Sequence, residues 1–218
     1  MQPHHWLERW EKQQIGFHQT HINTHLETFW PRSGINPGCR VFVPLCGKSL
    51  DMLWLRAQGH PVLGVEISPR AVADFFSEQG LEPTVNKEAR FERWQCEGLT
   101  LLVGDFFDLQ AADLQDIGAV YDRASLIALP PPMRADYARH MATIKPAAAM
   151  TLLISMEYPQ QQMQGPPFSV EETEIRALYE PHYRVDRLLQ ADVLGENPRF
   201  RQRGLTQLHA KVYRLFTP

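Results

Sequence analysis

The sequence predicts an α/β fold in which helices cover both faces of a doubly wound, mostly parallel sheet of about seven strands. Apolar runs of the length of buried strands alternate along the chain with segments whose apolar residues recur at helical spacing. Between residues 40 and 68 one such run, a loop, a helical segment and a second run follow each other, which is the order of a parallel βαβ unit. With 218 residues, 44% of them hydrophobic, we expect one domain spanning 1–218.

Composition narrows the class of protein. The formal net charge of −3 argues against a general nucleic-acid or anionic-membrane binder. No run approaches the ~18 consecutive apolar residues of a membrane span, and residues 1–12 lack the apolar core of a signal peptide. Cys39, Cys46 and Cys96 are too few and too scattered for a zinc or disulfide framework. We therefore expect a cytoplasmic monomer that binds a small molecule, without nucleic acid, membrane or metal.

Residues 6–30 are predicted to be helical, in two pieces divided near Gly16. Trp6 and Trp10 are four residues apart and share one helix face. The aromatic residues of this polar segment either pad the sheet or form a lid over a binding edge. His21 and His25 have the i, i+4 spacing of a metal site, but no acid or cysteine nearby completes one, which favours a solvated histidine face.

The next unit carries the strongest functional signal. Residues 41–43 form a buried run, residues 44–47 break it, and Ser49 is predicted to cap the following helix. Residues 62–65 form the second run, which ends on Glu66. Parallel strands present their carboxyl ends at one edge of the sheet, where nucleotide-like ligands bind. An acid at this position can accept hydrogen bonds from both ribose hydroxyls.

The sequence of the loop between these strands also argues against two classes of ligand. Gly47 would let a ligand approach the backbone, and Glu66 follows it by 19 residues, close to the ~20 expected of a ribose-binding acid. The three glycines of a dinucleotide fingerprint are missing, and the first glycine of a P-loop would have to replace Phe42. An adenosyl ligand without phosphates, such as S-adenosylmethionine, fits this pattern. The alternative is an ordinary buried βαβ unit with a solvated Glu66.

The following strand ends in a second candidate contact. Ser68 and Pro69 are predicted to start a helix that ends at Gly80, and residues 82–98 are predicted to be a loop with some strand character. Residues 99–103 form a buried strand that ends near Asp105 and Phe106. This acid and ring could bind an adenine amino group and stack on the base. The alternative is a turn aspartate followed by core phenylalanines.

The fourth strand, residues 117–121, ends in Asp122 and Arg123. This strand end faces the reacting group in doubly wound folds. Arg123 could contact a cofactor carboxylate or an electron-rich substrate atom. Alternatively, Asp122 and Arg123 form structural ion pairs with their neighbours. A helix from Pro130 to Ile144 and a fifth strand over residues 148–156 are expected to follow.

The last third of the chain should close the sheet. A loop rich in proline and glutamine spans residues 157–168, and Ser169 is predicted to cap a helix. Residues 183–193 and 205–216 alternate like a final pair of strands. The loop between them carries Arg199, Arg201 and Arg203, and it is either a solvated hairpin tip or a cationic wall of a substrate site.

Taken together, the segments resemble the thiopurine S-methyltransferase family of class I S-adenosylmethionine-dependent methyltransferases over nearly the whole chain. Pro44, Leu45, Cys46, Gly47 and Lys48 are the most distinctive part, because the first loop of methyltransferases is usually richer in glycine. The segments that carry the resemblance are residues 6–10, 17–19, 42–48, 64–68, 121–123 and 165–168.

The resemblance implies a Rossmann-like catalytic core over residues 40–218 with an N-terminal helical lid over residues 1–30. It implies methylation of thiopurines and other aromatic or heterocyclic thiols, and bacterial relatives are also associated with selenium and tellurium compounds in metalloid detoxification. Phe17 and Arg199 would contact the substrate. The implied cofactor site comprises Trp10, Leu45, Glu66 and Arg123, with Asp105 and Phe106 at the adenine, beside Gly47.

The expected reaction is in-line methyl transfer from a sulfonium to a soft nucleophile, in which positioning supplies most of the acceleration. Arg123 or Arg199 would favour the anionic form of an aryl thiol, and Trp10 could face the sulfonium cation. No general base is assigned; Asp122 and His21 are candidates. A nicotinamide-dependent oxidoreductase, disfavoured by the missing glycines, and a non-catalytic adenosyl-binding module remain as alternatives.

Overall fold

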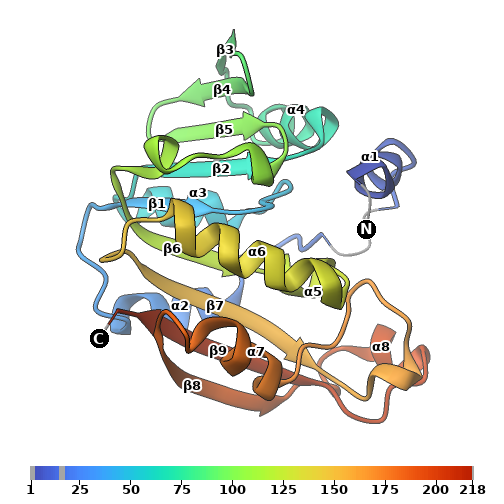
Figure 1. Cartoon of the computed structure of the whole chain (residues 1–218). Coiled ribbons are helices and arrows are strands. Elements are labelled where there is room, and N and C mark those ends of the chain that lie inside the picture. Colours follow the sequence, from blue (N-terminus) through green and yellow to red (C-terminus); the bar gives the residue numbers. More distant parts are fainter. Residues whose placement is uncertain (1–2, 15–17, 218) are drawn as a thin grey trace.

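The computed structural model describes residues 3–14 and 18–217 and contains one nine-stranded sheet (Figure 1). The strand order is β3-β4-β5-β2-β1-β6-β7-β9-β8. The five strands from β5 to β7 pair in parallel, whereas β3, β4, β9 and β8 join antiparallel. The strands are β1 (Arg40–Val43), β2 (Val62–Glu66), β3 (Thr84–Lys87), β4 (Glu92–Cys96), β5 (Leu99–Val103), β6 (Ile117–Arg123), β7 (Met150–Glu157), β8 (Arg184–Asp192) and β9 (His209–Phe216).

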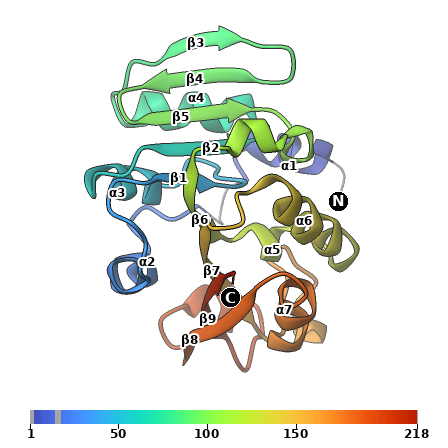
Figure 2. The ribbon, with the colours of Figure 1, turned by 60° about the vertical axis from the view of Figure 1, so that its left-hand side comes forward.

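Helices cover both faces of this sheet, as a doubly wound fold requires (Figure 2). The α-helices are α1 (Pro3–Glu11), α2 (Thr24–Phe29), α3 (Asp51–Ala57), α4 (Pro69–Glu78), α5 (Ser125–Ala128), α6 (Pro131–Ile144), α7 (Glu172–Tyr179) and α8 (Pro198–Gln202). The short 3-10 helices of the described residues are η1 (Trp30–Arg32), η2 (Phe106–Asp108), η3 (Ala111–Leu114) and η4 (Gln160–Gln162).

Two hydrophobic cores lie on opposite faces of the sheet. One packs α6 and α7 against the strands and includes Tyr137, Met141 and Ile175. The other packs α2, α3 and α4 and includes Met52 and Phe75. The central strands are buried on both faces, which explains why they read as continuous apolar runs in the sequence.

The fold class agrees with the expectation, but the strand count does not. The seven predicted strands correspond to β1, β2, β5, β6, β7, β8 and β9. The segment 82–98, which we expected to be largely a loop, adds the hairpin β3–β4 beside β5. All four residues of β3 are exposed, so this strand lacks the apolar alternation that identifies a half-buried strand.

Several predicted helix ends are shifted. The segment 6–30 contains α1 and α2, but residues 18–23 are irregular, and Gly16 lies outside the described residues. Helix α3 begins at Asp51, so Leu50 and not Ser49 holds the cap position, although Ser49 Oγ still accepts the N–H of Asp51 at 3.3 Å. Ser169 does not cap α7, because its hydroxyl accepts the N–H of Tyr158 instead. Ser68 caps α4 as expected, with Pro69 at its first position.

Candidate functional site

A cavity of about 750 Å³ lies at the carboxyl ends of the parallel strands, within the usual volume range of small-molecule sites. In Figure 1 the arrowheads of β5 and β7 point to the right, and α1 and α8 lie on that side. Phe17, a predicted substrate contact, lies outside the described residues. The other predicted site residues, all of which line this cavity, are Trp10, Leu45, Gly47, Glu66, Asp105, Phe106, Arg123 and Arg199.

The loop after β1 has an unusual backbone. Leu45 and Gly47 have φ angles of +46° and +52°, in the left-handed region that most residues avoid. A Cβ atom on Gly47 would lie 3.3 Å from Cζ2 of Trp10, a buried residue of α1. Glycine at this position therefore permits both the left-handed turn and the close packing of the Trp10 ring against the loop.

Glu66 is buried at the end of β2, and both of its carboxylate oxygens are held by backbone donors. Gly47 N donates to Oε2 and Ser68 N donates to Oε1, each at 2.9 Å. Burial raises the pKa of Glu66, although these backbone hydrogen bonds favour the charged form. A carboxylate can accept about four hydrogen bonds, so Glu66 retains acceptor capacity where it lines the cavity.

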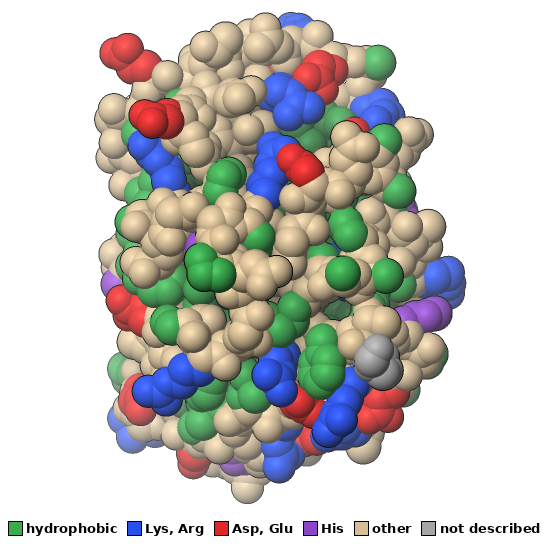
Figure 3. Space-filling view, turned by 90° about the vertical axis from the view of Figure 1, so that its left-hand side faces the viewer, with side chains coloured by type: hydrophobic (Ala, Val, Ile, Leu, Met, Phe, Trp, Pro, Cys, Tyr) green, Lys and Arg blue, Asp and Glu red, His purple; other side chains and the backbone are tan. Residues whose placement is uncertain are grey.

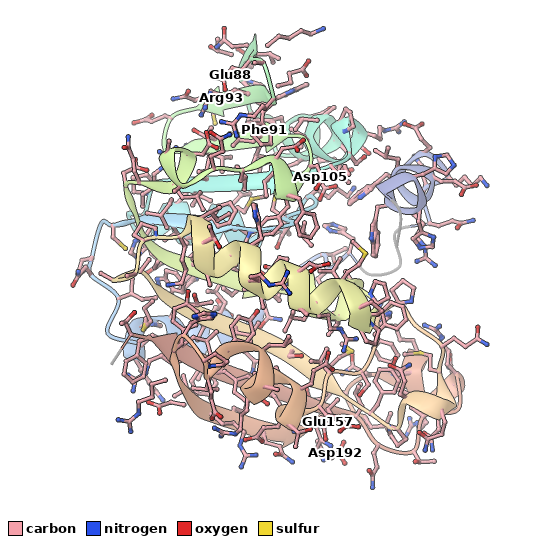
Figure 4. All side chains as sticks on the ribbon, in the orientation of Figure 1. Glu88, Phe91, Arg93, Asp105, Glu157 and Asp192 are labelled. Carbon is pink, nitrogen blue, oxygen red and sulfur yellow. The ribbon has the colours of Figure 1, made fainter. Side chains whose placement is uncertain are left out.

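Asp105 and Phe106 have the turn and core roles of one alternative, and both also line the cavity. Asp105 Oδ1 accepts the N–H of Phe107 at 3.0 Å and caps η2, which is the turn role. Phe106 is 2% exposed and packs on Tyr137 with ring centroids 4.7 Å apart, which is the core role. Both nevertheless line the cavity, and Figure 4 shows Asp105 at the carboxyl end of β5. Phe107, which is 36% exposed, lines it as well.

Arg123 forms a structural ion pair and lines the cavity at the same time. Its Nε lies 2.8 Å from Oδ2 of Asp51, a buried carboxylate on α3 that the sequence analysis missed. Gln19 accepts from Nη1 at 3.0 Å and Ser49 Oγ accepts from Nη2 at 3.2 Å. The signal for Asp51 was available, because it is the one acid in the apolar run over residues 50–55.

Neither candidate general base lines the cavity. His21 is exposed, and Asp122 is buried beneath α6, where its Oδ2 accepts a 2.7 Å hydrogen bond from Tyr137. Burial raises the pKa of Asp122 to about 6. His18, which we did not single out, lines the cavity, and burial together with the positive charges of Lys48 and Arg123 lowers its pKa.

The wall farthest from β2 comes from the late loops. Arg199 and Arg203 on and just after α8 line the cavity, whereas Arg201 does not. The loop over residues 195–204 is therefore not a bare hairpin tip. Pro166 and Pro167 form part of the same wall, together with apolar residues around α5. This wall therefore combines apolar surface with two cationic side chains.

The opposite face, seen from the left of Figure 1, is mixed in character (Figure 3). Positive and negative side chains are interspersed there with small hydrophobic areas. Over residues 3–14 and 18–217, no helix is long and apolar enough to cross a membrane. The same part of the chain holds no group of three or more histidine, cysteine or acidic side chains placed to bind a metal.

The sequence is similar to known proteins over nearly its whole length. The family model "Thiopurine S-methyltransferase" matches residues 1–217. Thiopurine S-methyltransferase from Nitrosospira multiformis is 50% identical over 100% of this chain and 99% of its own length. The Pseudomonas fluorescens enzyme of that name is 49% identical over 99% of both chains.

Solved structures with little sequence similarity share the fold. A SAM-dependent methyltransferase from Anabaena variabilis superposes with a TM-score of 0.66 at 12% identity, covering 99% of this chain and 95% of that chain. Geranyl diphosphate C-methyltransferase from Streptomyces coelicolor gives 0.61 at 11% identity, covering 89% and 79%. The cavity thus lies in a fold shared with known S-adenosylmethionine-dependent methyltransferases.

Proposed function

The chain belongs to the thiopurine S-methyltransferase family, and from this premise we propose that it methylates the sulfur of thiopurines and other aromatic or heterocyclic thiols. As a member it is an S-adenosylmethionine-dependent methyltransferase. The observation that carries the proposal is that one cavity collects eight of the nine predicted site residues. Selenium and tellurium compounds, as softer analogues of thiols, belong to the same proposal.

The cofactor is proposed to bind along the ends of β1, β2, β5 and β6. Glu66 suits the ribose hydroxyls, because its oxygens are fixed and retain lone pairs. Asp105 and Phe106 would border the adenine, and Arg123 would face the carboxylate of the methionine part. The backbone of Leu45 and Gly47 would lie against the ligand, in the turn that their left-handed φ angles form.

The acceptor is proposed to bind between the cofactor and α8. Arg199 and Arg203 contribute positive charge at this end, which would favour the thiolate over the thiol. The apolar side chains around α5 suit a planar ring. Phe17 is proposed as a further contact from the N-terminal segment.

The methyl donor supplies an electrophilic carbon bonded to a sulfonium sulfur. The protein positions the acceptor against this carbon and excludes water from the site. Trp10, Trp6 and Arg9 bring α1 against the cavity, so residues 1–30 are proposed as a lid that excludes water from the core over 40–218. A soft thiolate needs little help from a base, and we assign none. We further propose that the protein is a monomer in the cytoplasm.

Two linked experiments test this function. Calorimetry with S-adenosylhomocysteine should show 1:1 binding, and incubation with S-adenosylmethionine and 6-mercaptopurine should yield the S-methylated product by mass spectrometry. Binding without product from any thiol, selenium or tellurium acceptor would contradict the proposed reaction. Absence of binding would contradict the proposed cofactor site itself.

A further inference from the structure

Asp51 is a buried acid that does not line the cavity. The residue is 1% exposed at the start of α3, and its carboxylate accepts three hydrogen bonds, two from side chains of β6 and one from the backbone of Asn23. Tyr121 OH and Arg123 Nε reach Oδ2 at 2.9 and 2.8 Å, and the backbone N–H of Asn23 reaches Oδ1 at 2.8 Å. A buried carboxylate is stable only with such partners, so each of them also fixes its direction.

The contacts of Arg123 determine what it can still bind. A guanidinium has five N–H donors in a planar fork. Asp51, Gln19 and Ser49 engage one donor each on Nε, Nη1 and Nη2, which leaves two of the five among the described contacts. One donor remains on each terminal nitrogen, and Arg123, with 16% of its side chain exposed, lines the cavity. A pair of parallel donors matches a carboxylate.

We propose that Asp51 is a positioning residue that fixes the Arg123 fork toward the carboxylate of the bound cofactor and ties residues 18–23 to the same point. This inference rests on the proposed cofactor site. Asp51 holds Arg123 through Nε and holds the segment 18–23 through the N–H of Asn23. Gln19, in that segment, contacts Arg123 directly. Residues 18–23 therefore rest on the arginine and on its partner.

The energetic argument compares a fixed arginine with a free one. An unpaired arginine samples many rotamers, and ordering it costs side-chain entropy. Because Asp51 orders the Arg123 side chain during folding, that entropy is not lost again when the cofactor binds. Asp51→Asn cannot reproduce this, because the amide NH₂ would face either the N–H of Asn23 or the donors on the Oδ2 side.

A double-mutant cycle separates positioning from stability. Asp51→Asn, Arg123→Met and the double variant are compared by calorimetry with S-adenosylhomocysteine, and their melting temperatures are recorded. Asp51→Asn should raise the Kd about 10- to 100-fold. In the Arg123→Met background the same substitution should change the Kd less than about twofold, because the group through which it acts is gone.

Kinetics give an independent readout. Asp51→Asn should raise the KM for S-adenosylmethionine while the KM for the thiol and the kcat at saturating cofactor change less than about threefold. Glu157→Gln is the matched control. Glu157 lies at the end of β7, and the substitution removes its negative charge from the buried Lys211 of β9 (Figure 4). It should cost stability and leave the KM for S-adenosylmethionine unchanged.

Tyr121→Phe is a milder variant should Asp51→Asn not fold. It removes one donor to Asp51 and should raise the S-adenosylhomocysteine Kd about two- to fivefold, again only when Arg123 is present. Equal fold-changes with and without Arg123, or a Kd that does not change in Asp51→Asn, would overturn the positioning role while the enzyme assignment stands. An Arg123→Met variant that binds with wild-type affinity would instead contradict the proposed cofactor contact.

Discussion

The N–H of Gly47 donates a 2.9 Å hydrogen bond to Glu66 Oε2, so the acid at the end of β2 holds the loop that follows β1. The second oxygen does the same for Ser68 at the start of α4. One carboxylate thereby fixes two loops and keeps its remaining lone pairs toward the cavity. Removal of its charge should therefore disturb both the loops and the acceptor that faces the cavity.

Glu66→Gln should raise the Kd for S-adenosylhomocysteine about 10- to 100-fold, because an amide cannot accept from both backbone donors and from a ribose. The kcat at saturating cofactor should fall much less. Calorimetry and steady-state kinetics measure the two effects. Glu88→Gln, which loosens the ion pair with Arg93 on the β3–β4 hairpin, is the control and should bind normally (Figure 4). Wild-type affinity in Glu66→Gln would remove this residue from the ribose site.

Gly47→Ala should displace the Trp10 ring. The new Cβ would lie 3.3 Å from Trp10 Cζ2, at a φ angle of +52°. Gly38→Ala is a matched control, since its φ is +72° and nothing lies within 4 Å of its Cβ. Both variants should lose about 1 kcal/mol of unfolding free energy, but only Gly47→Ala should change the tryptophan fluorescence and weaken S-adenosylhomocysteine binding. Equal behaviour of the two variants would mean that Trp10 does not rest on this glycine.

Asp122→Asn tests the candidate base and a pH effect together. Burial raises the folded-state pKa to about 6, above an unfolded value of ~3.9. The stability that this group contributes is fully present below about pH 4 and is lost as the pH rises through about 6. An uncharged asparagine should therefore be stabilising at pH 7.5 relative to its effect at pH 4.5.

Urea unfolding at the two pH values measures the change for Asp122→Asn. Because Asp122 does not line the cavity, kcat should stay within about threefold of wild type. A drop of a hundredfold in kcat at unchanged stability would identify Asp122 as the base after all.

Lys145 should give the opposite pH trend. Its Nζ donates to the backbone carbonyls of Ala149 and Pro146, and burial lowers its pKa to about 8. The folded pKa lies below the unfolded value of ~10.4, so its stability contribution is present above that value and is lost as the pH falls through about 8.

Lys145→Met should remove this dependence. The difference in unfolding free energy between wild type and Lys145→Met should shift by about 1–3 kcal/mol in favour of wild type between pH 7.5 and 10. The comparison must be a difference, because burial also raises the pKa of Cys39, Cys46 and Cys96 and makes the wild-type curve fall over that range. Parallel curves for the two proteins would show that Lys145 titrates normally in the fold.

Much of the architecture follows from local sequence patterns. The central strands are short apolar runs, Ser68 and Pro69 mark the start of α4, and Pro131 stands at the start of α6. The β3–β4 hairpin could not be recognised this way, because β3 is wholly exposed and is held by pairing with β4 rather than by burial of a hydrophobic face. Ser169 likewise offered a cap signal that a tertiary hydrogen bond to Tyr158 N overrides.

The sequence by itself determined which strand ends carry the side chains that line the cavity, because a strand, its loop and the residue that closes it are neighbours along the chain. Only the tertiary structure decided the partners of those side chains. Tyr121 donates to Asp51 across 70 positions, and the same carboxylate binds Arg123. A buried charge takes the partner that chain topology brings within about 3 Å, and no local pattern encodes that distance.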